Sequence, residues 1–154
     1  VIVEGQGSIL HPGSTATLPL MRGTCPTHMI LCHIARNDSL RSQENIKIPD
    51  LKKFIELNES LASVIGTYPK AKVVGVALNT SLMSDENAQE IINSVENETG
   101  LPSTDVVRDG REKIFSLLLS LFAMVVCCSC SYLIIRLYIY FITQRICPSL
   151  GCRD

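Results

Sequence analysis

The sequence has almost no net charge and contains no run of like-charged residues. Its 14 Lys and Arg nearly balance 15 Asp and Glu, which leaves a formal net charge of -1. Because proteins that bind nucleic-acid phosphates need a basic surface, this balance argues against nucleic acid as the main partner. At 154 residues the chain is long enough for one compact domain and too short for two comfortable ones.

The common phosphate-binding motifs are missing from the chain. The stretch Gly5-Gln6-Gly7 begins like the dinucleotide fingerprint G-x-G-x-x-G, but Leu10 stands where the third glycine is needed. A loop of the form G-x-x-x-x-G-K-[ST] needs a Lys to reach the phosphates, and the first Lys of the chain is Lys47. The G-x-S-x-G elbow of a hydrolase is also missing, so no single motif names a reaction.

Neither a disulfide framework nor a metal site is expected. The seven Cys are an odd number and no secretory signal peptide precedes them, which favours reduced thiols in the cytoplasm. Cys25 and His28 have the spacing of half a zinc site, but no second half is evident. Cys32 and His33 are neighbours on a predicted strand, so their side chains point to opposite faces.

Residues 1–113 alternate continuous apolar runs with amphipathic stretches. Runs that are apolar at every position are typical of parallel strands covered by helices on both faces. The order of the elements predicts βαβ units in a layered α/β domain. The predicted elements are strands at 1–3, 29–32, 73–78 and 104–107, a short helix before the second strand, a helix from the cap Asp50 to the stop Gly66, and a helix from Ser84 to Gly100.

The composition changes from Ile114 onward. Residues 114–135 carry no charged side chain and are long enough to cross a hydrocarbon core of about 30 Å. One interpretation is an apolar helix over 114–142, with a single-pass membrane anchor through 114–135 and a short Cys-containing tail over 143–154. The other interpretation is an abnormal C-terminus that has not evolved as membrane sequence.

Polar residues follow the predicted strands, where ligands bind in open parallel sheets. Glu4 ends the first strand, which is where P-loop proteins place the acid that holds magnesium or its water. His33 and Arg36 follow the second strand and can act as a general base and an anion clamp. Asn79 and Thr80 end the third strand and can face the same crevice. For Glu4 the alternative is an acid that ends a strand for solubility, and for His33 and Arg36 it is an ordinary polar loop.

The blocks VEGQGSILHP, LCH, KVVGVALNT and ETGLPSTDVVR occur in this order along the chain. With these blocks the chain resembles the C-terminal domain of bacterial D-glutamate N-acetyltransferase-like proteins over about residues 1–113. The resemblance implies a three-layer α/β fold with a mostly parallel sheet of the P-loop NTPase type. The family's phosphate loop, G-T-D-C-x-x-G-K-x-T, lies upstream of the strand that opens this chain, which implies an N-terminally truncated domain whose first strand lacks a neighbour.

The resemblance also implies roles for individual residues. Glu4 and His33 correspond to catalytic positions, either being the base for the substrate's ammonium proton. Where the family continues with E-P-G-R, this chain has Ile34-Ala35-Arg36-Asn37, so Arg36 takes the place of the family Arg. The residues implied in substrate or cofactor binding are Gly5, Gln6, Gly7, Ser8, His11 and Arg36.

The implied activity of the parent family is acetyl transfer from acetyl-CoA to the amino group of D-glutamate. Acetyl-CoA is the implied cofactor. Because the family's fold is of the P-loop type, ATP and magnesium are the alternative cofactors that the resemblance implies. Because the phosphate loop is missing, no cofactor is expected for this chain alone and we expect it to be inactive by itself. The other hypothesis is a non-catalytic, membrane-tethered α/β module that binds a ligand or a partner.

Overall fold

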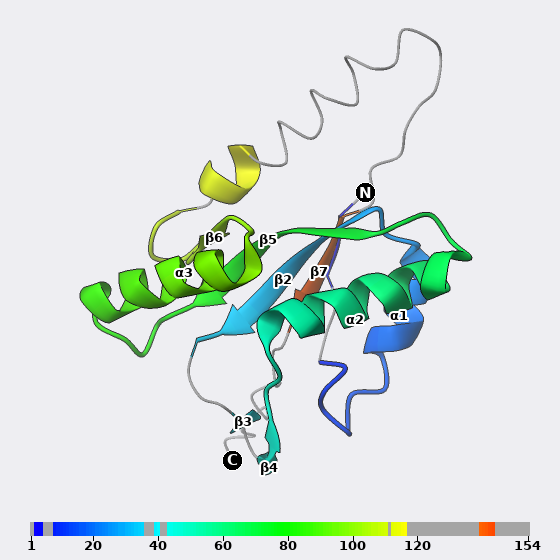
Figure 1. Ribbon diagram of the computed structural model, residues 1–154, viewed down its shortest axis with the longest axis horizontal. Helices are drawn as coiled ribbons and strands as arrows, with labels where there is room; N and C mark the ends of the chain where they lie inside the picture. The colour runs from blue at the N-terminus through cyan, green and yellow to red at the C-terminus, as the bar shows by residue number, and fades with distance from the viewer. Residues whose placement is uncertain are drawn as a thin grey trace, which may run out of the picture.

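The computed structural model describes residues 2–4, 8–35, 39–40, 43–110, 112–116 and 139–143. Its elements are β1 (Ile2–Glu4), α1 (Thr17–Thr24), β2 (His28–Ile34), β3 (Ser39–Leu40), β4 (Gln43–Lys47), α2 (Leu51–Ser63), the short 3-10 helix η1 (Val64–Gly66), β5 (Lys72–Asn79), α3 (Asp85–Thr99), β6 (Ser103–Thr104) and β7 (Ile139–Thr143). Five strands form a parallel sheet in the order β1-β7-β2-β5-β6 (Figure 1). β3 and β4 pair as a separate antiparallel ribbon between β2 and α2, where the sequence analysis predicts no strand.

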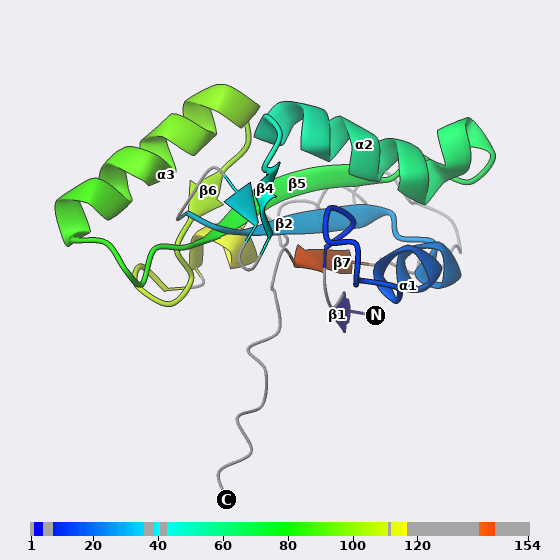
Figure 2. The same ribbon diagram turned by 90° about the horizontal axis from the view of Figure 1, so that it is seen from below.

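Helices cover both faces of the sheet, so the fold is a three-layer α/β arrangement. α2 and α3 lie side by side on one face (Figure 2). Met29 and Leu31 of β2 join the core under these helices, whereas Ile30 packs on the opposite face against Ile114, in a helical turn at 112–116. Alternate residues of β2 thus enter two different cores, which is why the run 29–32 has no polar position. The predicted layered fold is confirmed.

Local capping signals place α2 and α3 where the sequence predicts them. Asp50 Oδ1 accepts a hydrogen bond from the Lys53 N–H at 3.1 Å and caps α2. Ser84 Oγ accepts one from the Asn87 N–H at 3.4 Å, and α3 ends before Gly100, whose φ of 70° is the left-handed conformation that glycine adopts without strain. α2 ends at Ser63, before the predicted stop Gly66, because the chain is already left-handed at Val64 and Ile65 as well as at Gly66.

The Ser84 cap provides a direct test of α3. The substitution Ser84→Ala removes an acceptor from an exposed helix N-terminus and is expected to lower the free energy of unfolding by about 1 kcal/mol. Ser81→Ala, in the same exposed loop, is the matched control and is expected to change it by less than about 0.5 kcal/mol. Urea unfolding followed by circular dichroism measures both. Equal midpoints for the two variants would show that this cap contributes nothing.

The predicted apolar helix over 114–142 is wrong for its last residues, because 139–143 form the strand β7. The sequence Ile-Tyr-Phe-Ile-Thr is rich in residues that favour strands, and periodicity alone cannot separate a short apolar run from a buried helix. β7 pairs in parallel with β1, so the expectation that the first strand lacks a neighbour is also wrong. β1 is nevertheless an edge strand rather than a buried one, and Ile2 is 66% exposed.

The membrane interpretation gains no support from the described residues. None of the helices described by the structure is both long and apolar enough to cross a bilayer. From residue 117 to residue 135 the predicted anchor lies outside the described part of the chain, as does the predicted tail from residue 144 onward.

Candidate functional site

The carboxyl ends of the parallel strands bring several of the predicted polar residues to one edge of the sheet. Glu4 is the last residue of β1 and is exposed, and His33 is the penultimate residue of β2 and is half-buried. Thr80 directly follows β5, and Asp105 directly follows β6. In open α/β sheets this is the edge at which ligands bind, so these residues define the candidate site.

A pocket of about 410 Å³ opens beside His33, between the N-terminus of α2 and one side of α3. Two carboxylates, Asp50 and Glu98, lie on its wall, and its described lining contains no Lys or Arg. Apolar side chains make up much of the rest. The lining residues are His33, Ala35, Ile48, Pro49, Asp50, Leu51, Met83, Ile91, Ser94, Val95 and Glu98.

The two pocket carboxylates are held in place by backbone N–H groups at the start of α2. Glu98 Oε1 accepts a hydrogen bond from the Leu51 N–H at 2.8 Å, which ties α3 to α2. Asp50 Oδ1 accepts from the Lys53 N–H at 3.1 Å. Each carboxylate has a second oxygen with which to contact a ligand. An imidazole with two carboxylates suits the binding and deprotonation of an ammonium group better than the binding of an anion.

The structure does not bring the two predicted catalytic residues together. Glu4 is level with Phe141 of β7, which is level with Ile30 of β2, and His33 lies three residues further along β2. Three residues span about 10 Å along a strand and two strand spacings add about 10 Å across the sheet. Their backbones are therefore about 14 Å apart, so Glu4 and His33 are alternative bases rather than a pair acting on one proton.

Ser8 and His11 shape the loop that follows β1. Ser8 is buried and its Oγ accepts a hydrogen bond from the Leu10 N–H at 3.2 Å, while its carbonyl accepts from the His11 N–H at 3.0 Å. His11 Nδ1 accepts from the Gly13 N–H at 3.0 Å. A Cβ at Gly13 would lie 3.2 Å from the His11 ring, so the glycine permits this close approach. Both predicted binding residues thus hold the loop in shape.

The remaining predicted binding residues, Gly5, Gln6, Gly7 and Arg36, lie outside the described residues.

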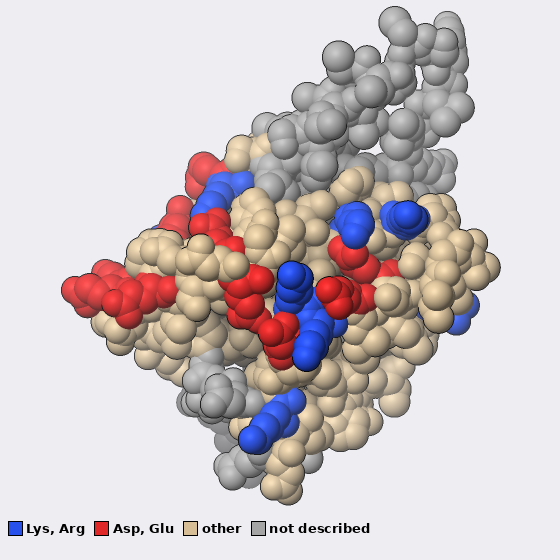
Figure 3. Space-filling view, viewed as in Figure 1, with Lys and Arg blue, Asp and Glu red and all other residues tan. Residues whose placement is uncertain are grey.

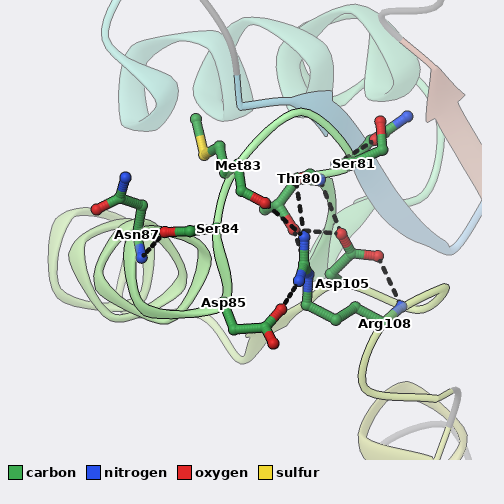
Figure 4. A network of polar contacts seen from close by, with 9 residues as sticks. Thr80, Ser81, Met83, Ser84, Asp85, Asn87, Asp105 and Arg108 are labelled. Atoms are coloured by element: carbon green, nitrogen blue, oxygen red, sulfur yellow. Dashed lines mark hydrogen bonds and ion pairs between the residues drawn. The ribbon is translucent and has the colours of Figure 1, made fainter.

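A buried hydrogen-bond network joins the ends of β5 and β6 (Figure 4). Asp105 is 2% exposed, and its carboxylate accepts hydrogen bonds from the Thr80 N–H at 2.7 Å and from the Thr80 hydroxyl. It also accepts from the N–H groups of Val107 at 2.9 Å and Arg108 at 3.2 Å. Burial raises the pKa of Asp105, but the hydrogen bonds from Thr80, Val107 and Arg108 outweigh it and hold the pKa below its ordinary value.

Arg108 extends this network to the loop between β5 and α3. Its Nε donates to Thr80 Oγ1 at 3.2 Å, its Nη2 donates to the carbonyls of Thr80 at 3.1 Å and Met83 at 3.0 Å, and its Nη1 donates to Asp85. With three guanidinium nitrogens engaged, Arg108 acts as a clamp on the loop (Figure 4). Because Met83 lines the pocket, this clamp also shapes the site beside His33.

Sequence reasoning missed the roles of Asp105 and Arg108. The predicted strand over 104–107 is wrong in its extent: the strand ends at Thr104, because the Asp105 side chain captures the N–H groups of Val107 and Arg108 and turns the chain. The signal that could have found them was the same rule applied at Glu4 and His33, namely that polar residues after a parallel strand face the ligand edge.

The charges on the described part of this edge do not fit a cofactor phosphate. Figure 3 shows acidic side chains spread along α3, at the left of the view. The pocket has no described cation, and Arg108 is engaged by protein acceptors. These described residues therefore do not fit a binding site for the phosphates of acetyl-CoA or ATP. The acidic residues of α3 are Asp85, Glu86, Glu90, Glu96 and Glu98.

Comparison with known proteins identifies the family. Residues 1–115 match a family described as a domain of unknown function (DUF1611_C), P-loop domain. The chain belongs to the DUF1611 family. Two relatives named D-glutamate N-acetyltransferase, from a Pseudoalteromonas species and from Tritonibacter scottomollicae, are 35% and 31% identical to it over 114 residues, which is 73% of this chain. The resemblance seen in the sequence is confirmed at the level of the family.

A solved DUF1611 family protein from Anabaena variabilis has the same fold. Its crystal structure matches with a TM-score of 0.72 and 45% sequence identity, over 75% of this chain and 34% of the Anabaena chain. The match to the two curated relatives likewise covers 34% of their length. This DUF1611 chain therefore spans about a third of the length of its relatives.

Proposed function

We propose that this chain is a piece of a cytoplasmic D-glutamate N-acetyltransferase-like enzyme, and that its carboxyl edge forms one wall of the amino-acid site. The observation that carries this proposal is the 35% and 31% identity to two relatives named for that activity. Since the chain spans about a third of those relatives, the activity belongs to a larger assembly, of which this chain supplies one part.

The pocket beside His33 supports a role in handling the substrate's amino group. An ammonium group must lose a proton before it can attack an acyl group, and a neutral imidazole near physiological pH is suited to accept that proton. Asp50 and Glu98 place negative charge in the same pocket, which favours binding of the cationic ammonium form. We assign His33 as the base of this proposal, with Glu4, two strands away, as the alternative base.

The other proposed contacts are those that the family pattern implies. Arg36 would pair with a substrate carboxylate, as the family pattern implies. Gly5, Gln6 and Gly7, with the loop shaped by Ser8 and His11, would line the neighbouring part of the site. Acetyl-CoA would be the acyl donor of the assembled enzyme, held by parts of the relatives that this chain does not match.

The first test is the activity of the isolated chain. Incubated with acetyl-CoA and D-glutamate, the purified 154-residue chain is expected to form no N-acetyl-D-glutamate above the rate without protein, whereas the Pseudoalteromonas relative forms it under the same conditions. Mass spectrometry of the product measures both. Acetylation by the isolated chain would overturn the view that the activity requires a larger assembly.

The second arm of this test asks which histidine matters. The rest of the Pseudoalteromonas protein is supplied as a separate polypeptide, and activity is measured with His33→Gln and with the matched variant His28→Gln, at the opposite end of β2. Loss of a general base typically lowers kcat by about 100-fold or more. We expect that loss for His33→Gln and less than a threefold change for His28→Gln, about 0.6 kcal/mol in activation free energy. Equal activity of the two variants would contradict the role of His33.

A further inference from the structure

The pocket beside His33 has an acidic mouth and an apolar floor. Asp50 and Glu98 are exposed, so their carboxylates lie at the mouth of the pocket. Leu51 and Val95 line the same pocket but are only 6% and 7% exposed, so they lie at its floor. A ligand that fills the pocket therefore places one part beside two carboxylates and another part against apolar side chains.

The mouth favours a cationic group. Asp50 and Glu98 each use one carboxylate oxygen to accept a backbone N–H group at the start of α2, which holds both side chains at the pocket. Among the described residues that line the pocket, none is a Lys or Arg that could neutralise them. An ammonium group is attracted to this pair of carboxylates, whereas a carboxylate on a ligand is repelled by it.

The floor favours an apolar group. Met83 and Ile91 are half-buried and add to the apolar lining that Leu51 and Val95 provide. A charged side chain placed against these residues loses its hydration, and the described lining offers no cation in exchange. An apolar side chain placed there gains free energy by leaving water. The volume of about 410 Å³ lies within the range of small-molecule sites, and the flexible thioether of Met83 can adapt to the shape of the ligand.

We propose that this pocket selects an amino acid whose side chain is apolar over one whose side chain is a carboxylate. The ammonium group lies at the mouth, where His33 can accept its proton, and the side chain lies on the floor. The α-carboxylate is left for the Arg36 contact proposed above. This inference rests on the proposed amino-acid site and specifies its substrate class. The two relatives named for D-glutamate are 35% and 31% identical to this chain, and few pocket residues decide between a charged and an apolar side chain.

The experiment compares three probes of similar length on the wild-type chain: D-methionine, D-glutamine and D-glutamate. Each is titrated into the 154-residue chain, and the amide NMR shifts of Leu51 and Val95 report binding in the pocket. We expect D-methionine to bind at least about tenfold more tightly than D-glutamate, with D-glutamine between them. Equal or tighter binding of D-glutamate would overturn this inference and leave the proposed function standing. Failure of all three to shift these amides would overturn both.

A pair of double variants tests the role of the mouth. Asp50→Asn with Glu98→Gln removes both charges but keeps an oxygen to cap α2 and an oxygen to accept the Leu51 N–H. The matched control, Glu86→Gln with Glu90→Gln, removes two charges from exposed positions of α3 outside the described lining. We expect the preference for D-methionine over D-glutamate to fall at least about threefold in the pocket variant and less than about twofold in the control. An unchanged preference in the pocket variant, or an equal fall in both, would overturn the selection by the mouth.

Discussion

The substitution Asp105→Asn is expected to lower the free energy of unfolding by about 2–4 kcal/mol, although it changes neither the volume nor the shape of the side chain. The carboxylate accepts hydrogen bonds on both oxygens: Thr80 donates to Oδ2, and Val107 and Arg108 donate to Oδ1. An amide in the same place must direct its NH2 group at one of these sets of donors. One set is then left unsatisfied in a position that is 2% exposed.

The matched control for this substitution is Asp109→Asn. Asp109 is exposed and lies four residues further along the same turn. The substitution Asp109→Asn therefore removes the same charge from the same region. We expect a change of less than about 0.5 kcal/mol for the control. Denaturant unfolding of both variants gives the difference. Equal destabilisation would mean that net charge, and not the hydrogen-bond network, determines the result.

The pH dependence of stability provides an independent readout of Asp105. Its folded-state pKa lies below the ordinary value of 3.8, so the folded state favours the charged carboxylate. The resulting stability is fully present above pH values near that ordinary pKa and is lost as the pH falls through it toward the lower folded-state pKa. The wild type is therefore expected to lose stability more steeply than Asp105→Asn on acidification below about pH 4. Parallel curves would contradict the hydrogen-bonded role of the carboxylate.

The substitution Phe54→Ala is expected to lower the free energy of unfolding by about 3–5 kcal/mol. Phe54 is 1% exposed and is one of the largest buried side chains in the core between α2 and the sheet. Its removal loses both the transfer free energy of the ring and the packing contacts around the cavity that remains. We expect a loss of this size because the neighbouring core residues of β2 and β5 are held by the sheet and cannot move into the cavity.

Leu57→Ala, one turn along the same helix, is the control for Phe54→Ala. Leu57 is 43% exposed, so truncation removes less buried surface and we expect a loss below about 1 kcal/mol. Both substitutions replace a large apolar residue by the best helix former, so helix propensity does not explain a difference between them. If the two variants unfold at the same denaturant concentration, the core does not lie where the structure places it.

The sequence by itself determined the family, the layered α/β class and the two main helices. These features depend on local signals. Asp50 and Ser84 cap helices through N–H groups three residues away, and Gly100 ends α3 through its own backbone conformation. The run 29–32 identifies a strand buried on both faces without reference to its neighbours. Four blocks of residues in a fixed order were enough to identify the family, which residues 1–115 match.

Only the tertiary structure decided how these elements meet. The pairing of β7 with β1 and β2 joins residues more than a hundred positions apart, and the strand-favouring residues of 139–143 do not by themselves separate a strand from the end of an apolar helix. The distance between Glu4 and His33 follows from strand order and register, which place a whole strand between them. The bond from Thr80 to Asp105 likewise depends on β5 and β6 being neighbours. Non-local pairing is a property of the folded chain, because it requires two segments to be brought together against the entropy of closing the loop between them.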